Sequence, residues 1–113
     1  MITIYHNPRC SKSRECNVFL ETSGNDMQVI NYMKTLFTFE TLKNVIDLLK
    51  INPIELVRKN EQIWKDSFKG KDLSDDEIIT AMVENPKLIQ RPIVVNGNKA
   101  IIARPLEKMN EIL

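Results

Sequence analysis

Cys10, the first of two cysteines near the start of the chain, lies among hydroxyl and cationic side chains. The four residues that follow Cys10 all carry such groups: Ser11, Lys12, Ser13 and Arg14. If a helix begins here, its free N-terminal amides favour negative charge, and a thiol beside them has a lowered pKa. The same groups could hold an oxyanion against the thiolate. The segment therefore predicts an activated nucleophile with an anionic substrate; the alternative is that Cys10 is only a small residue at a helix start.

Two other residues could take part in thiol chemistry. His6, the only histidine, lies four residues before Cys10 and could tune the thiolate or orient a loop, although spacing alone favours a hydrogen-bonded structural role. Cys16 would lie about 9 Å from Cys10 along a helix axis, whereas a disulfide needs Cα atoms within roughly 7 Å. Cys16 also shares an apolar stripe with Phe19 and Leu20. We therefore predict that Cys16 packs in the core, and the absence of a C-x-x-C motif argues against a dithiol mechanism.

Three arginines occupy positions next to predicted turns. Arg58 follows a helix that starts at Pro53, Arg91 precedes Pro92, and Arg104 follows a predicted hairpin. A guanidinium can donate two parallel bonds to a planar oxyanion, although solvated charge is the usual role of an arginine. We expect no metal site, because one histidine and two separated cysteines do not supply a ligand set.

The elements that would position these residues begin with a βαβ unit. Ile2–Tyr5 is rich in β-branched residues and predicts a strand that ends at Asn7-Pro8. The spacing from Ser11 to about Ser23 predicts a helix, and Met27–Asn31 predicts a second strand. Two strands joined by a helix are expected to be parallel, with a right-handed crossover.

The middle of the chain predicts helices. Apolar spacing indicates one from Phe39 to Lys50, and Asn52-Pro53-Ile54-Glu55 has the capping residue, proline and glutamate of a second start. Asn60 could cap a short piece that runs through Trp64. Ser74-Asp75-Asp76-Glu77 is a capping box before a helix that should stop at Asn85-Pro86.

The last third predicts a hairpin. Asn96-Gly97 separates two β-branched runs, which favours antiparallel strands, and a short helix from Arg104-Pro105 to near Ile112 follows. The strand after Pro92 should lie beside the first strand and bring Arg91 to the end of the sheet where Cys10 lies. The element order predicts one α/β domain, residues 1–113, with a thioredoxin-like fold: a mixed four-stranded sheet and a helical insertion between the βαβ unit and the hairpin.

Composition excludes some classes of function. The 113 residues carry a net charge of +1, with 42% hydrophobic and 27% charged residues, so nothing indicates a general nucleic-acid or membrane binder. The N-terminus lacks the pattern of a secretion signal, and no apolar run approaches the roughly 20 residues of a membrane span. We therefore expect a cytoplasmic monomer with reduced thiols.

The segment "YHNPRCSKSR" resembles the active-site segment of the ArsC family of glutaredoxin-coupled arsenate reductases, in which H-N-P-x-C precedes small residues and S-R. The resemblance continues through "VRKNE", "NPKLIQRPIVV" and "ARP", and so covers nearly the whole chain. It implies a thioredoxin-like fold, with a cis-proline at Arg91-Pro92. It also implies catalytic roles for Cys10 and His6. It implies that Arg58, Arg91 and Arg104 bind the substrate. To these the cation- and hydroxyl-rich helix start adds Ser11, Lys12 and Ser13 as predicted substrate-binding residues.

The resemblance further implies the reaction. Arsenate would be reduced to arsenite through a covalent Cys10–arsenic adduct, with no bound cofactor, glutathione as co-substrate and glutaredoxin as partner. Ser11-Lys12 departs from the glycine and small hydroxyl residue of well-studied members, and indicates the shorter arsenate-reductase-like subgroup. The alternative is a regulatory module like the Spx regulators, which share the fold and bind RNA polymerase. Many Spx regulators carry C-x-x-C, which this chain lacks. The presence of Cys10 together with three arginines favours the enzyme.

Overall fold

The computed structural model describes residues 2–7, 11–22, 24, 26–103, 108 and 111. The chain divides into two compact units, each described by itself below: Met1–Thr35 with Arg91–Leu113, which we call the sheet unit, and Leu36–Gln90, which we call the helical unit. The prediction of a single domain stays a prediction. Within the described residues, no helix is long and apolar enough to cross a membrane.

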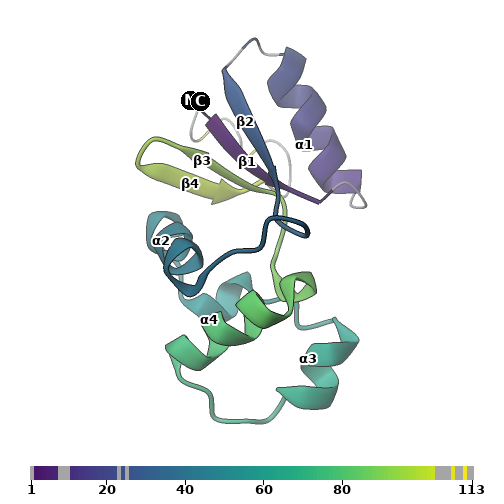
Figure 1. Ribbon diagram of the computed structural model, residues 1–113, viewed down its shortest axis with the longest axis vertical. Helices are drawn as coiled ribbons and strands as arrows, with labels where there is room; N and C mark the ends of the chain where they lie inside the picture. The colour runs from purple at the N-terminus through teal and green to yellow at the C-terminus, as the bar shows by residue number, and fades with distance from the viewer. Residues whose placement is uncertain are drawn as a thin grey trace. The chain divides into compact units, whose positions relative to one another are not determined.

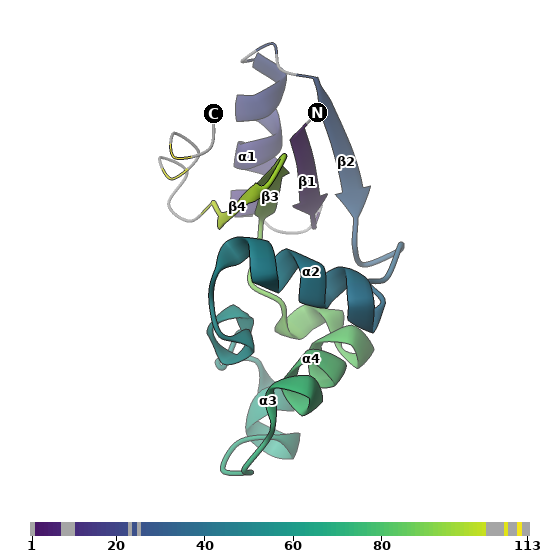
Figure 2. The same cartoon turned by 90° about the vertical axis from the view of Figure 1, so that its left-hand side faces the viewer.

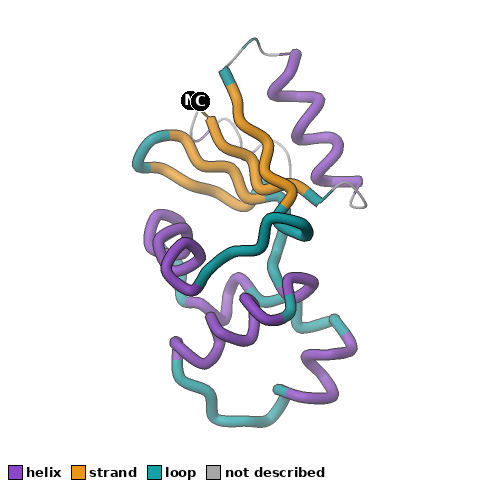
Figure 3. Tube along the Cα trace, in the orientation of Figure 1, coloured by secondary structure: helices purple, strands orange, loops and turns teal. Residues whose placement is uncertain are grey.

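The sheet unit holds four strands, drawn in orange in Figure 3. They are β1 (Ile2–His6), β2 (Met27–Asn31), β3 (Ile93–Asn96) and β4 (Lys99–Ile102). Their order is β2-β1-β3-β4; β1 pairs with β2 in parallel, and the β1–β3 and β3–β4 pairs are antiparallel. The parallel pair, the antiparallel hairpin and the position of β3 beside β1 confirm the predicted thioredoxin-like arrangement.

Helix α1 (Ser11–Thr22) connects β1 to β2 and lies against one face of the sheet (Figures 1 and 2). Side chains in β1 alternate between buried and partly exposed, as a strand with one covered face requires. The core between helix and sheet consists of Ile2, Ile4, Cys16, Val94 and Ala103. Cys16 is fully buried there, which confirms that its side chain packs in the core.

The hairpin forms as predicted, but its turn is shifted by one residue. Asn96 pairs with Lys99, so the two loop residues are Gly97 and Asn98 rather than Asn96 and Gly97. Gly97 has a φ of 62°, and a positive φ at the first loop residue alone is typical of a type II′ turn.

The helical unit, all of whose residues the structure describes, consists of helices and short 3-10 turns (purple in Figure 3). They are α2 (Phe39–Leu49), η1 (Pro53–Leu56), α3 (Gln62–Ser67), α4 (Asp75–Glu84) and η2 (Pro86–Leu88). Helix α4 packs against α2, η1 and η2, and the α2–α4 contact is visible in Figure 2. Buried side chains on α2 and α4 contribute much of the core of this unit: Leu42, Val45, Ile46, Ile78, Ile79 and Met82.

The strongest local signal for a helix start is confirmed. Ser74 accepts from the amide of Glu77 at 3.2 Å, and the carboxylate of Glu77 accepts from the amide of Ser74 at 3.2 Å. Helix α2 begins with a similar exchange between Thr38 and Thr41. Both helices end where the sequence predicts: α2 at Lys50 and α4 at Asn85. Lys50 has a φ of 57°, in the left-handed region.

Two expectations for the helical unit are wrong. The helix expected from Pro53 is a single 3-10 turn. Asn60 does not cap a helix, because it lies inside a turn that the Glu61 amide closes on the carbonyl of Arg58 at 3.1 Å; α3 therefore begins at Gln62. The helix predicted from Arg104 to Ile112 falls outside the described residues, apart from residues 108 and 111, and stays a prediction.

Candidate active site

One end of the sheet gathers several of the predicted site residues. Tyr5 pairs with Ile93, so the next residue of β1, His6, and the residue before β3, Pro92, lie at the same end. Ala103 donates its amide to the carbonyl of Pro92 at 2.9 Å and extends the hairpin to that end. The sheet therefore brings His6 and the Arg91-Pro92 peptide, which is cis as predicted, to a common edge.

Helix α1 begins directly after Cys10, as the sequence predicts. Cys10 itself lies outside the described residues; α1 begins at Ser11, the next residue, and its first turn contains no acidic side chain. The positive end of the helix dipole is therefore not offset by a carboxylate in that turn. The backbones of Ser11, Lys12 and Ser13 form this first turn, while their side chains are outside the described part of the chain.

His6 is the last residue of β1 and is 8% exposed. It lies opposite Asn31 in the register with β2, and Asn7 after it is also buried. A buried imidazole at the end of the strand that leads toward Cys10 fits both the structural and the catalytic interpretation. The catalytic role of His6 stays a prediction.

Cys16 has the opposite environment from the one predicted for Cys10. Burial raises the pKa of the Cys16 thiol to about 11, because the thiolate would lose its hydration among the aliphatic side chains of the core. At neutral pH this thiol is protonated and covered, and is therefore a poor nucleophile.

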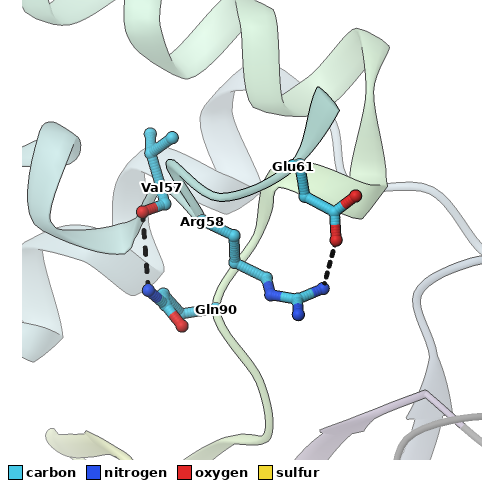
Figure 4. A network of polar contacts seen from close by, with 4 residues as sticks. All are labelled: Val57, Arg58, Glu61 and Gln90. Atoms are coloured by element: carbon cyan, nitrogen blue, oxygen red, sulfur yellow. Dashed lines mark hydrogen bonds and ion pairs between the residues drawn. The ribbon is translucent and has the colours of Figure 1, made fainter. Parts of the chain in front are cut away.

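Arg58 lies in the helical unit on a backbone segment that is fixed by hydrogen bonds. Its amide donates to the carbonyl of Leu88 at 2.7 Å. The amide of Gln90 donates to the carbonyl of Leu56 at 2.8 Å, and the Gln90 side-chain amide donates to the carbonyl of Val57 at 3.4 Å. These bonds tie the turn that carries Arg58 to a segment about thirty residues later, and Figure 4 shows the contact between Gln90 and Val57.

The side chain of Arg58 has a partner that the sequence analysis missed. Its Nη1 donates to Oε1 of Glu61 at 2.7 Å, and the two side chains are 25% and 29% exposed. The signal was present as an acidic residue three positions after Arg58 in "VRKNE". This spacing predicts a contact only when the turn from Arg58 to Glu61 is known, because the two side chains meet across that turn.

Arg91 lies in the sheet unit and is partly buried. Its Nε is buried and has no hydrogen-bond partner among the residues that the structure describes. A buried N–H without an acceptor is costly, so an anion that accepted from it would gain a strong bond. Arg104 lies outside the described residues. The convergence of Arg58, Arg91 and Arg104 on Cys10 stays a prediction, because Arg58 and Arg91 belong to different units.

Comparison with known proteins identifies the family. The profile of the ArsC family matches residues 5–112. The protein YfgD of Escherichia coli, described as uncharacterized, is 43% identical over 99% of this chain and 96% of its own length. An arsenate reductase of Haemophilus influenzae is 38% identical over 99% of this chain and 98% of its own length. The structure of an arsenate reductase from Vibrio cholerae superposes with a TM-score of 0.94 at 45% identity, covering 99% of this chain and 97% of that one. The chain is a member of the ArsC family.

Proposed function

We propose that this protein reduces arsenate to arsenite with Cys10 as its nucleophile. Relatives from Haemophilus influenzae and Vibrio cholerae that match the chain almost end to end are named arsenate reductases. The observation that carries the proposal is the start of α1 at Ser11, directly after Cys10, with no acid in its first turn. Such a helix end favours both a thiolate and a bound oxyanion.

The first step forms a sulfur–arsenic bond. The Cys10 thiolate attacks arsenic(V), one arsenate oxygen takes up protons and leaves as water, and the product is a Cys10–S–arsenate adduct. Arsenic stays in the +5 state in this step. Amides at the start of α1 and the guanidiniums of Arg58, Arg91 and Arg104 would stabilise the charge on the arsenate oxygens.

A second thiol is needed to transfer the electrons. Cys16 is fully buried in the core of the sheet unit, so it cannot supply this thiol without local unfolding. We therefore propose glutathione. Its thiolate attacks the Cys10 sulfur, the sulfur–arsenic bond breaks, and the bonding pair leaves with arsenic as arsenite. Two sulfurs are thereby oxidised to a mixed disulfide while arsenic(V) becomes arsenic(III).

Glutaredoxin would complete the cycle. A glutaredoxin thiolate attacks the glutathione sulfur of the mixed disulfide, and Cys10 leaves as the thiolate that starts the next turnover. This scheme needs a compartment that keeps thiols reduced, for which we propose the cytoplasm.

Turnover with defined thiol systems tests the proposal. Arsenite formation is measured with glutathione and glutaredoxin, and in parallel with thioredoxin and its reductase. We expect turnover with the first system, its loss in Cys10→Ser and its retention in Cys16→Ser. Absence of arsenite with both systems would show that the chain is not an arsenate reductase, and capture of RNA polymerase by the same protein would then support the regulatory alternative.

A further inference from the structure

The side chain of Glu61 does not cap the helix that follows it. It is the N-cap residue of α3, yet it makes no side-chain capping bond. By contrast, Thr38 and Ser74 accept from the amides of the helices that they precede. The carboxylate of Glu61 instead accepts from Nη1 of Arg58 at 2.7 Å (Figure 4). The side chain of Glu61 is thus engaged with Arg58 and not with the start of α3.

The backbone near Arg58 is already fixed without the side chain of Glu61. The bond from the Arg58 amide to Leu88 and the bonds from Gln90 to Leu56 and Val57 hold the segment in place. What these bonds leave undetermined is the conformation of the long arginine side chain, which has many rotamers. The Arg58–Glu61 ion pair is partly exposed, and such pairs contribute little to folding stability. The main effect of this ion pair is therefore to orient the guanidinium of Arg58.

We propose that Glu61 is a positioning residue, which holds Arg58 by Nη1 so that its remaining donors are presented to an oxyanion. A guanidinium has five N–H donors, and within the helical unit the contact with Glu61 uses Nη1. Nε and Nη2 remain for a second, forked contact. The identification of that oxyanion as arsenate rests on the proposed function, whereas the positioning role can be tested with either arsenate or its isostere phosphate.

The experiment measures anion binding at Arg58 in the full-length chain. The side-chain Nε–Hε resonance of Arg58 is followed by NMR while inorganic arsenate, and separately inorganic phosphate, is added. Glu61→Gln removes the charge and keeps the size of the side chain. We expect it to weaken anion binding by about three-fold or more, because the guanidinium is no longer held in one orientation. The folding midpoint should stay close to that of the unmodified protein.

Asp66→Asn is the matched control. Asp66 is an exposed carboxylate on α3 that accepts from the Gln62 side chain at 2.7 Å, so its replacement removes the same charge from the same unit. We expect anion binding in this variant to equal that of the unmodified protein. A second control is Glu61→Gln in an Arg58→Ala background, in which anion binding is followed through backbone amide resonances; a residue that acts through Arg58 should have no further effect on anion affinity there.

Four results would overturn the positioning role. They are equal binding in the Glu61→Gln and Asp66→Asn variants, tighter binding in Glu61→Gln, a Glu61 effect that persists without Arg58, and an Arg58 resonance that responds to neither anion. Tighter binding would mean that Glu61 competes with the anion instead of preparing its site.

Turnover separates this inference from the proposed function. In an active enzyme, Glu61→Gln should raise KM for arsenate and leave kcat within about two-fold. A protein that binds anions in a Glu61-dependent manner but forms no arsenite would support the positioning role and contradict the proposed reaction. A protein that forms arsenite and binds anions equally well without the Glu61 carboxylate would contradict the positioning role alone.

Discussion

The two cysteines should differ in reactivity by orders of magnitude in the folded protein. With a pKa of about 11, Cys16 has a thiolate fraction of about 10⁻⁴ at pH 7. An ordinary exposed thiol, with a pKa of about 8.5, is about 3% thiolate at the same pH. The environment of Cys16 alone therefore predicts a difference of about 300-fold, before any activation of Cys10 is considered.

Activation of Cys10 should increase this difference and shift its pH dependence. If the start of α1 and the nearby cations stabilise the thiolate, the alkylation rate of Cys10 should reach half of its maximum below pH 8.5. The assay is alkylation with iodoacetamide from pH 5 to pH 10, with each cysteine quantified by peptide mass spectrometry. Denatured protein provides the reference, since there the two thiols should react alike.

Two results would contradict this reasoning in different ways. If Cys10 reacts no faster than Cys16 near neutral pH, the activated-thiolate hypothesis fails. If Cys10 reacts much faster but with its midpoint at or above pH 8.5, accessibility explains the difference and the helix end does not activate the thiol.

Two further predictions concern stability and substrate binding. Because the thiol pKa of Cys16 is higher in the folded than in the unfolded state, the unfolded state loses its proton first as pH rises. The free energy of unfolding should therefore fall by about 3 kcal/mol relative to Cys16→Ala between about pH 8.5 and pH 11. Chemical denaturation at each pH measures this, and free energies of unfolding that change with pH in the same way in both proteins would contradict it. Lysine in place of Arg58, Arg91 or Arg104 keeps the charge but loses the forked geometry, so kcat/KM for arsenate should fall ten-fold or more, about 1.4 kcal/mol, with exposed Arg14→Lys as the control. Unchanged kinetics in all three variants would mean that these arginines are surface charges.

Elements set by local signals could be predicted from the sequence. The β-branched residues of β1 and the capping box of Ser74 and Glu77 act within a few residues, and both formed where expected. The start of α3 could not be predicted in this way. Asn60 has a local preference for a cap, but the Arg58 turn is held by bonds to Leu88 and Gln90, which are distant in sequence.

The hairpin turn shows how the core selects between two local signals. The segment contains both Asn96-Gly97 and Gly97-Asn98, and either pair could form a two-residue loop. A loop at Asn96-Gly97 would place Lys99 opposite the fully buried Val94, where the observed register places Ile101. Moving the turn by one residue shifts the strand pairing by two, which would carry Lys99 from the end of the hairpin to a position opposite the buried Val94, so burial favours the observed register.

The candidate site was predictable in its residue types but not in its contacts. The cation-rich segment after Cys10 and the turn positions of the arginines are visible in the sequence. The contact between Glu61 and Arg58 depends on a turn whose first residue, Arg58, is held by a backbone bond to Leu88. The local pattern therefore indicates which groups are present, and the tertiary structure determines which of them meet.

In the proposed reaction Cys10 alone reacts with arsenic, and an external thiol resolves the adduct. The most direct measurement is mass spectrometry of the protein after incubation with arsenate and glutathione, without glutaredoxin, together with quantification of arsenite. We predict one glutathione attached at Cys10, one arsenite released for each mixed disulfide, and an unmodified Cys16. A Cys10–Cys16 disulfide or glutathione on Cys16 would show that Cys16 takes part, and a mixed disulfide without arsenite would show that oxidation of Cys10 is not coupled to arsenate reduction.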